Sequence, residues 1–273
     1  MRTRRPPLLA LALALLIGGV IAPGHARADA VWRVNLYKAA GYLTQDPYYN
    51  ACVAASTMIM LNQIALNGTG GNGFAWKTHL TKDKVGDSFD LTSVLAYARS
   101  HDTLSATGAG SDPHGWRNAL NFYGWGSGAL GPASRVYDDR AEISFDTAVK
   151  DAVLAIARYH KPVGVLAWAG RHAQVITGYV ATGEDPSVST NFVVNSIYLS
   201  DPLAADQITN KLYSVDTFRT GSLTLRFRRY SQTDSPADDP YTPGWIRSSV
   251  RSGPSEWFAR YILILPIRDG LPG

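Results

Sequence analysis

The sequence predicts an α+β fold in which a helical N-terminal half packs on an antiparallel β-sheet formed by the C-terminal half. Apolar residues recur with a helical period between residues 52 and 159, and the period changes to about two from residue 162 onward. Helices followed by strands are typical of the α+β class, whose sheets are mainly antiparallel. With 273 residues, of which 45% are hydrophobic, the chain can form one sizeable domain or two closely packed halves.

Four helices are predicted before residue 160. In the first, Val53 and Thr57 are among the residues that follow the helical period, and Asn67-Gly68 ends the helix. Asp90 is a suitable N-cap for the second helix, because its side chain can accept a hydrogen bond from a free backbone N–H group of the first turn. The predicted helices cover residues 52–66, 90–98, 114–123 and 144–159.

Five strands are predicted in the rest of the chain. The first two are joined across Gly170-Arg171, which favours direct pairing between them. The polar, proline-rich segment 231–254 is expected to form a long surface loop, and segment 68–73 is expected to be a loop. The predicted strands cover residues 162–169, 172–180, 191–199, 222–230 and 261–267.

The first 28 residues have the features of a bacterial-type signal peptide. Arginines at positions 2, 4 and 5 precede an apolar run over residues 8–21, and Ala26-Arg27-Ala28 forms a small-x-small cleavage site. We therefore expect a secreted, periplasmic or cell-envelope protein whose mature domain covers residues 29–273. The apolar run is short for a membrane span, so no stable membrane insertion is expected after cleavage, although an uncleaved anchor is the alternative.

The charge of the chain gives no support for a nucleic-acid partner. The whole chain has 26 basic and 22 acidic residues, but the signal peptide contains four arginines and no acid. The mature chain is therefore neutral and has no basic stripe of the kind that binds nucleic acid. No histidines or acids stand at a spacing typical of metal ligands, so we expect neither a metal nor another cofactor.

Cys52 is the only cysteine, and it falls at the start of the first predicted helix. Exported proteins usually pair their cysteines in disulfides, so a single cysteine is either a small buried hydrophobic residue or a reactive thiol. The free N–H groups and the dipole at a helix N-terminus favour the thiolate, which is the nucleophilic form. The position of Cys52 alone leaves both alternatives open.

Three other residues are candidates to complete a cysteine-hydrolase centre. His172 opens a predicted strand, and its imidazole can accept the thiol proton and return it to a leaving group. Asp201 ends the next strand and can orient this ring, although Asp-Pro also starts ordinary turns and Asn195 is a rival orienter. Gln45 lies seven residues before Cys52 and can donate to an oxyanion, although a single glutamine is usually a surface residue.

In order and context these segments resemble the papain-like cysteine peptidases, and in particular the bacteriocin-processing (double-glycine leader) peptidases. Gln45 followed by Cys-Val-Ala-Ala-Ser at 52–56 is similar to the family's Gln and Cys-Gly-Pro-Ala. Segment 161–179 resembles its Pro-Val and Gly-His-Ala-x-Val-x-x-Gly-Tyr motifs, and Asp201-Pro202 resembles its Asp-Pro strand end. Segments 115–124 and 213–218 also look like family elements, so the resemblance spans residues 45–266.

This resemblance implies a papain-like fold and a role for each candidate residue. Cys52 would be the nucleophile, His172 the general base and acid, Asp201 the residue that orients His172, and Gln45 an oxyanion donor. The implied protein is an exported cysteine hydrolase that cleaves a peptide or isopeptide bond of a peptide or protein substrate through a thioester.

Two alternatives to this function remain open. The chain has Val53 and Ala54 where the family has Gly and Pro, and a β-branched residue beside the nucleophile would narrow substrate access. This departure favours a catalytically inactive binding or structural protein that keeps the papain-like scaffold. A thiol acyl transferase or cell-wall amidase uses the same residue types, but the 120-residue interval from Cys52 to His172 disfavours it.

Overall fold

The computed structural model describes residues 30–69, 90–103, 110–126, 132–203, 208–220, 227, 229 and 255–270. The α+β class is confirmed, because the chain combines helices with a sheet whose strands pair antiparallel. The elements are, in order, β1 (Val31–Asn35), α1 (Cys52–Leu66), α2 (Leu91–Ser100), α3 (Pro113–Trp125), β2 (Tyr137–Glu142), α4 (Phe145–Tyr159), β3 (Val163–Ala167), β4 (His172–Gly183), β5 (Phe192–Ser200), β6 (Lys211–Ser214), α5 (Val215–Thr220) and β7 (Tyr261–Pro266).

Seven strands in the described part of the chain form one antiparallel sheet. Its order is β2-β7-β3-β4-β5-β6, and β1 pairs with the second half of β4, beyond the residues that pair with β3. The expectation that the sheet comes from the C-terminal half alone was wrong, because β1 and β2 precede residue 145. Both escaped prediction because β1 is short and β2, with the sequence YDDRAE, has little apolar alternation.

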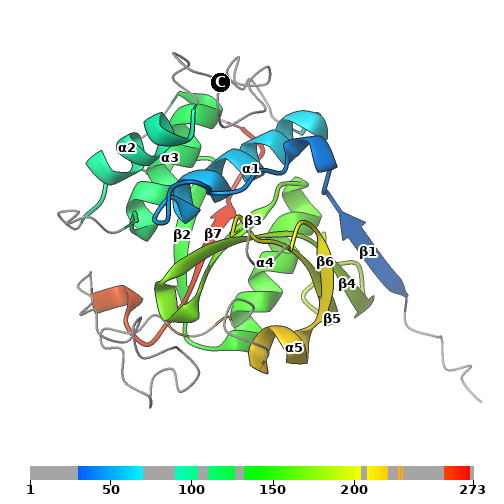
Figure 1. Ribbon diagram of the computed structural model, residues 1–273. Coiled ribbons are helices and arrows are strands. Elements are labelled where there is room, and N and C mark those ends of the chain that lie inside the picture. Colours follow the sequence, from blue (N-terminus) through cyan, green and yellow to red (C-terminus); the bar gives the residue numbers. More distant parts are fainter. Residues whose placement is uncertain are drawn as a thin grey trace, which may run out of the picture.

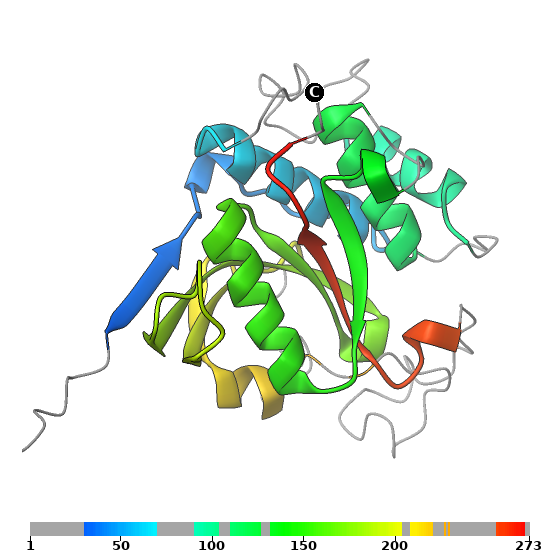
Figure 2. The same cartoon turned by 180° about the vertical axis from the view of Figure 1, so that it is seen from behind.

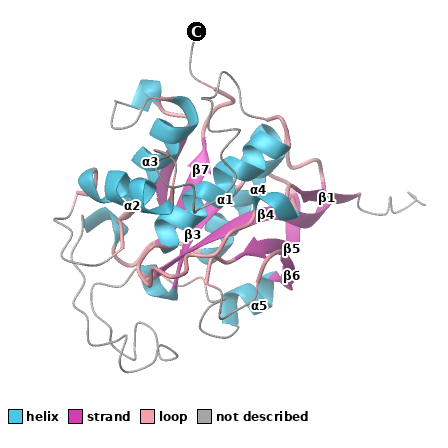
Figure 3. Cartoon of the chain, turned by 45° about the horizontal axis from the view of Figure 1, so that its top comes forward, coloured by secondary structure: helices cyan, strands magenta, loops and turns pink. Residues whose placement is uncertain are grey.

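Helices cover both faces of this sheet. The first three helices gather on one side of it (Figure 1), where α1 lies over β3 and β4 (Figure 3), whereas α4 lies against the opposite face (Figure 2). One apolar core joins α1–α3 to side chains such as Leu166 and Val175, and a second joins α4 to side chains such as Val165 and Ile176. Neighbouring strand residues thus enter different cores, which explains why the central strands are apolar at nearly every position.

The predicted starts of the second and fourth helices are confirmed by their caps. The Asp90 carboxylate accepts a hydrogen bond from Ser93 N at 2.6 Å at the start of α2, and Ser144 Oγ accepts one from Thr147 N at 3.1 Å at the start of α4. No side chain caps α1 in this way. The first N–H groups of α1 are therefore available to other partners, which matters for the cysteine that begins this helix.

Close packing between α3 and the sheet depends on Gly164 in β3. A Cβ atom at this position would lie 2.5 Å from Cζ2 of Trp116, whose side chain is fully buried. No side chain larger than hydrogen fits there without displacing the indole. Gly164 and Trp116 thereby fix how closely the helical layer approaches the sheet that carries His172.

Most predicted element bounds agree with the structure to within a few residues. The first helix covers 52–66 as predicted, and four of the five predicted strands are present. Between β3 and β4, a 3₁₀ turn at Trp168–Gly170 replaces the expected two-residue connection. The predicted signal peptide, loop 231–254, and most of strand 222–230 and of loop 68–73 lie outside the described residues. Of the helices that the structure describes, none is long and apolar enough to cross a membrane.

Candidate active site

Cys52 is the first residue of α1, and the start of this helix is fastened to the start of β4. The Cys52 side chain is 9% exposed and lies at the edge of the core formed by α1–α3. One turn further along the helix, the buried Ser56 hydroxyl donates to the Ala173 carbonyl at 3.1 Å. This bond holds the N-terminus of α1 beside the strand residue that follows His172.

The Cys52 thiol lies next to the imidazole of His172, and the two groups shift each other's pKa. Burial opposes the charged thiolate, but the hydrogen bond to His172, the positive charge of that ring and hydrogen bonds from the backbone of Ala173 and Val53 outweigh it. The pKa of the Cys52 thiol is therefore lowered. The dipole of α1 acts in the same direction, because a helix N-terminus favours negative charge.

His172 is held from its other side by Asp201. The Nε2 atom of His172 lies 2.6 Å from Asp201 Oδ1, and both side chains are almost completely buried. This bond commits Nε2 to the carboxylate, so Nδ1 is the ring nitrogen that faces the thiol. Burial disfavours the charged ring, yet the charge and hydrogen bond of Asp201, together with the contact to Cys52, raise the pKa of His172 to about 10.

The pairing register of β4 and β5 explains why His172 and Asp201 meet. Val175 lies opposite Ser200, so the next residues toward the start of β4 and the end of β5, Gln174 and Asp201, come side by side. Gln174 Nε2 donates to Asp201 Oδ2 at 2.6 Å, and Leu203 N donates to Oδ1 at 2.8 Å. Every oxygen of the Asp201 carboxylate is thus occupied by a donor.

Gln45 is buried, at 3% exposure, and belongs to the segment that leads into Cys52. Its backbone N–H donates to the Pro202 carbonyl at 2.8 Å, which ties this segment to the Asp201-Pro202 corner. Its side-chain Nε2 donates to the Tyr49 carbonyl at 2.7 Å. The structure therefore places Gln45 beside the same corner as the His172–Asp201 pair, in a buried position rather than at the surface.

Two other sequence expectations can be compared with the structure. Asn195, the rival orienter, is exposed in the middle of β5, whereas Asp201 makes the contact with His172. The Val53 side chain is only 2% exposed and packs in the core of the helical layer. The Val53 side chain therefore occupies the protein interior instead of the solvent side of Cys52.

Trp168 and Gln174 were not among the predicted catalytic residues. The Trp168 ring lies beside the His172 ring in a tilted arrangement, with 5.3 Å between centroids and 38° between planes. Trp168 and Ala169 have φ values of 50° and 56°, a strained conformation for residues other than glycine that is often found at functional sites. The sequence carried one usable signal: Gln174 is two residues from His172, on the same side of a strand.

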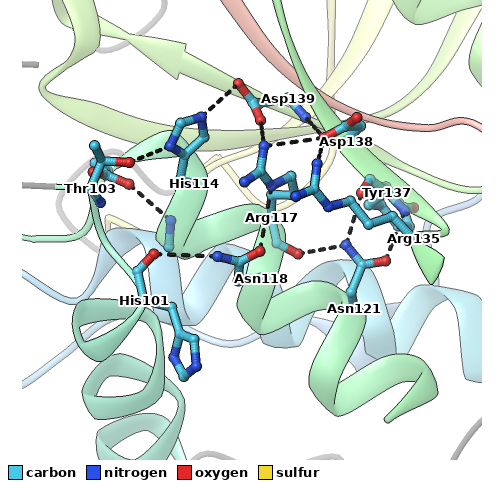
Figure 4. A network of polar contacts seen from close by, with 12 residues as sticks. His101, Thr103, His114, Arg117, Asn118, Asn121, Arg135, Tyr137, Asp138 and Asp139 are labelled. Atoms are coloured by element: carbon cyan, nitrogen blue, oxygen red, sulfur yellow. Dashed lines mark hydrogen bonds and ion pairs between the residues drawn. The ribbon is translucent and has the colours of Figure 1, made fainter. Parts of the chain in front are cut away.

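A second polar cluster lies on α3 and β2 and shares no residue with the site above (Figure 4). Arg117 forms ion pairs with Asp138 and Asp139, and the latter also lies 3.6 Å from His114 Nε2. These bonds fasten α3 to the edge strand of the sheet, and their charges are mutually paired. Across the ranges that the structure describes, no group of three or more His, Cys, Asp or Glu side chains could hold a metal ion.

Comparison of the chain with protein-family models, with curated proteins and with solved structures found no match.

Proposed function

We propose that this protein is a cysteine hydrolase with a papain-like arrangement of Cys52, His172 and Asp201. The observation that carries the proposal is the buried, hydrogen-bonded His172–Asp201 pair, which lies beside the Cys52 thiol at the N-terminus of α1. A base that is itself oriented by a third group is the arrangement that activates a thiol for nucleophilic attack.

The reaction begins with attack of the Cys52 thiolate on the carbonyl carbon of a peptide or isopeptide bond. The new C–S bond places an electron pair on the carbonyl oxygen, and the Cys52 backbone N–H and the Gln45 side chain are the proposed donors to this oxyanion. When the tetrahedral intermediate collapses, the C–N bond breaks and the leaving amine takes a proton from Nδ1 of His172. A thioester on Cys52 remains.

Hydrolysis of the thioester uses the same residues in the reverse sense. His172, now neutral, removes a proton from water, whose oxygen attacks the thioester carbonyl carbon. The C–S bond then breaks, the carboxylic acid leaves, and the proton on His172 again stabilises the thiolate. Asp201 fixes the ring and balances its positive charge throughout, without itself taking the proton.

The alternative of an inactive binding protein depended on Val53 narrowing access to the nucleophile. Its side chain is packed in the core, so this observation no longer favours an inactive protein over an enzyme. An acyl transferase would share the first half-reaction and differ only in the acceptor of the acyl group. We further propose that the enzyme is exported and acts on a peptide or protein substrate outside the cytoplasm, as the signal-peptide features of residues 1–28 indicate.

A peptidyl epoxide probe for cysteine hydrolases tests the proposal, because every thiol adduct must lie on the single cysteine. The native protein is expected to take up one probe per chain, and the denatured protein is expected to take up almost none. His172→Ala should be labelled at least about 100-fold more slowly than wild type. His114→Ala, which alters a histidine of the separate α3–β2 cluster, is the matched control and should react at the wild-type rate. Equal labelling of wild type and His172→Ala would refute the proposed function.

A further inference from the structure

The buried side chain of Gln174 has a partner in the site but no role in the reaction described above. It is fully buried in β4, two residues after His172, and its Nε2 donates to Asp201 Oδ2 at 2.6 Å. A buried amide next to a buried carboxylate is costly unless the two are paired, so their contact fixes both. The question is whether this contact only joins two strands or also serves the imidazole.

We propose that Gln174 is a positioning residue, which holds the Asp201 carboxylate so that Oδ1 stays directed at Nε2 of His172. This inference rests on the proposed function, since it assigns a role within that site. A carboxylate can turn about its last bond, and terminal torsions of this kind are broad. Oδ2 must therefore be fixed if Oδ1 is to keep a 2.6 Å bond to the ring.

Each oxygen of the Asp201 carboxylate is held by its own donors. Oδ1 accepts from His172 and from the Leu203 backbone, while Gln174 supplies the donor on Oδ2. The backbone of Asp201 is fixed separately, because its N–H donates to the Ile208 carbonyl at 2.8 Å and its carbonyl accepts from the Tyr42 hydroxyl at 2.8 Å. Loss of the Gln174 donor would therefore free the carboxylate plane while the main chain stays in place.

The geometry predicts a consequence at Cys52, which is three contacts away from Gln174, through Asp201 and His172. If the carboxylate turns, its charge and hydrogen bond no longer support the imidazolium, and the thiolate loses its partner in turn. Replacement of Gln174 should therefore change the reactivity of a thiol that it does not touch. A purely structural link between β4 and β5 would lower stability without moving this reactivity.

The test replaces Gln174 by methionine, which has a similar length and no donor. A second variant, Gln174→Asn, keeps a buried amide but is one methylene too short to reach Oδ2. The matched control is Thr177→Val, which removes a buried hydroxyl group from the same strand, β4. This hydroxyl contacts Tyr198 of β5 and Asn210 but not Asp201. Urea unfolding of all three variants reports the structural cost of each change.

Two readouts separate this inference from the proposed function. The first is the NMR signal of the His172 Nε2 proton, which a short bond to a buried carboxylate shifts downfield and protects from exchange. The second is the rate of Cys52 alkylation by iodoacetamide between pH 5 and pH 9. Both Gln174 variants should lose or shift the proton signal and react about tenfold more slowly at pH 6, whereas Thr177→Val should match wild type in both.

Each outcome has a distinct meaning. Wild-type proton signals and alkylation rates in Gln174→Met and Gln174→Asn would overturn the positioning role and leave the proposed function intact. A third outcome is that wild-type Cys52 is alkylated like an ordinary thiol while the His172 Nε2 proton signal still disappears in both Gln174 variants. This outcome would support the positioning role and refute the proposed function. Loss of the signal in Thr177→Val as well would show a general effect of strand packing and would also overturn the inference.

Discussion

Replacing Asp201 by asparagine separates the charge of this carboxylate from its shape. The asparagine oxygen can still accept from His172 and Leu203, and a half-turn of the Gln174 amide presents its oxygen to the new NH₂ group. The ring of His172 then stays buried without a negative partner. Since burial opposes its charge, we expect its pKa to fall from about 10 to the ordinary value of 6.5 or below.

The size of this change follows from the same values. A return of the His172 pKa from about 10 to 6.5 corresponds to about 5 kcal/mol of lost support for the imidazolium. At pH 7 only about a quarter of the rings would then carry a proton, instead of nearly all of them. Because the thiolate depends on that proton, alkylation of Cys52 at pH 7 should slow by at least about fourfold and by as much as about a thousandfold.

The assay combines an NMR titration of the His172 ring with initial rates of iodoacetamide alkylation, since the single cysteine makes the rate specific to Cys52. The unfolding free energy of Asp201→Asn in urea shows whether the variant remains folded. A folded variant whose imidazole pKa and alkylation rate equal those of the wild type would refute the assignment of Asp201 as the group that supports the imidazolium.

Three further substitutions have expected outcomes. Trp168→Ala removes the ring that lies beside His172, so probe labelling of Cys52 should slow by about tenfold, and an unchanged rate would exclude a role for the indole. Gly164→Ala should lower the urea unfolding free energy by about 1–3 kcal/mol, because its Cβ would lie 2.5 Å from Trp116, and an unaffected midpoint would contradict this packing. Burial and the nearby charge of Asp112 raise the pKa of Asp102 to about 7, so its contribution to stability is complete below about pH 4 and is lost as the pH rises through 7. Asp102→Asn should therefore reduce the loss of unfolding free energy between pH 5 and pH 8 by about 1 kcal/mol, allowing for partial solvent exposure, and an identical loss in both proteins would count against this account.

The residues with the strongest chemical character were accessible from the sequence. Cys52 opens a helix whose period is plain, and His172 and Asp201 stand at the start and the end of consecutive apolar strands. In an antiparallel pair, the start of one strand and the end of the next lie at the same edge, so these two residues were bound to approach each other. The buried position of Gln45 was less predictable, because it depends on a backbone bond to Pro202.

The parts that escaped prediction depend on contacts between distant segments. β1 is a five-residue strand stabilised by pairing with β4, and β2 is polar because charged side chains such as Asp138 and Asp139 pair with arginines there. Gln174 looks like any polar residue of a strand until the register places it against Asp201. The strained turn at Trp168 has no glycine at its first two positions, so local propensity argues against it.

The most direct test of the central claim is the pH dependence of Cys52 alkylation in the wild-type protein. The rate is measured with iodoacetamide from pH 4 to pH 10, and the denatured chain supplies the reference for an ordinary cysteine. A thiolate paired with the His172 imidazolium predicts that the native rate reaches a plateau well below the pH at which the denatured thiol ionises. A single rise at the same pH as in the denatured chain, or at a higher pH, would contradict the Cys52–His172–Asp201 centre.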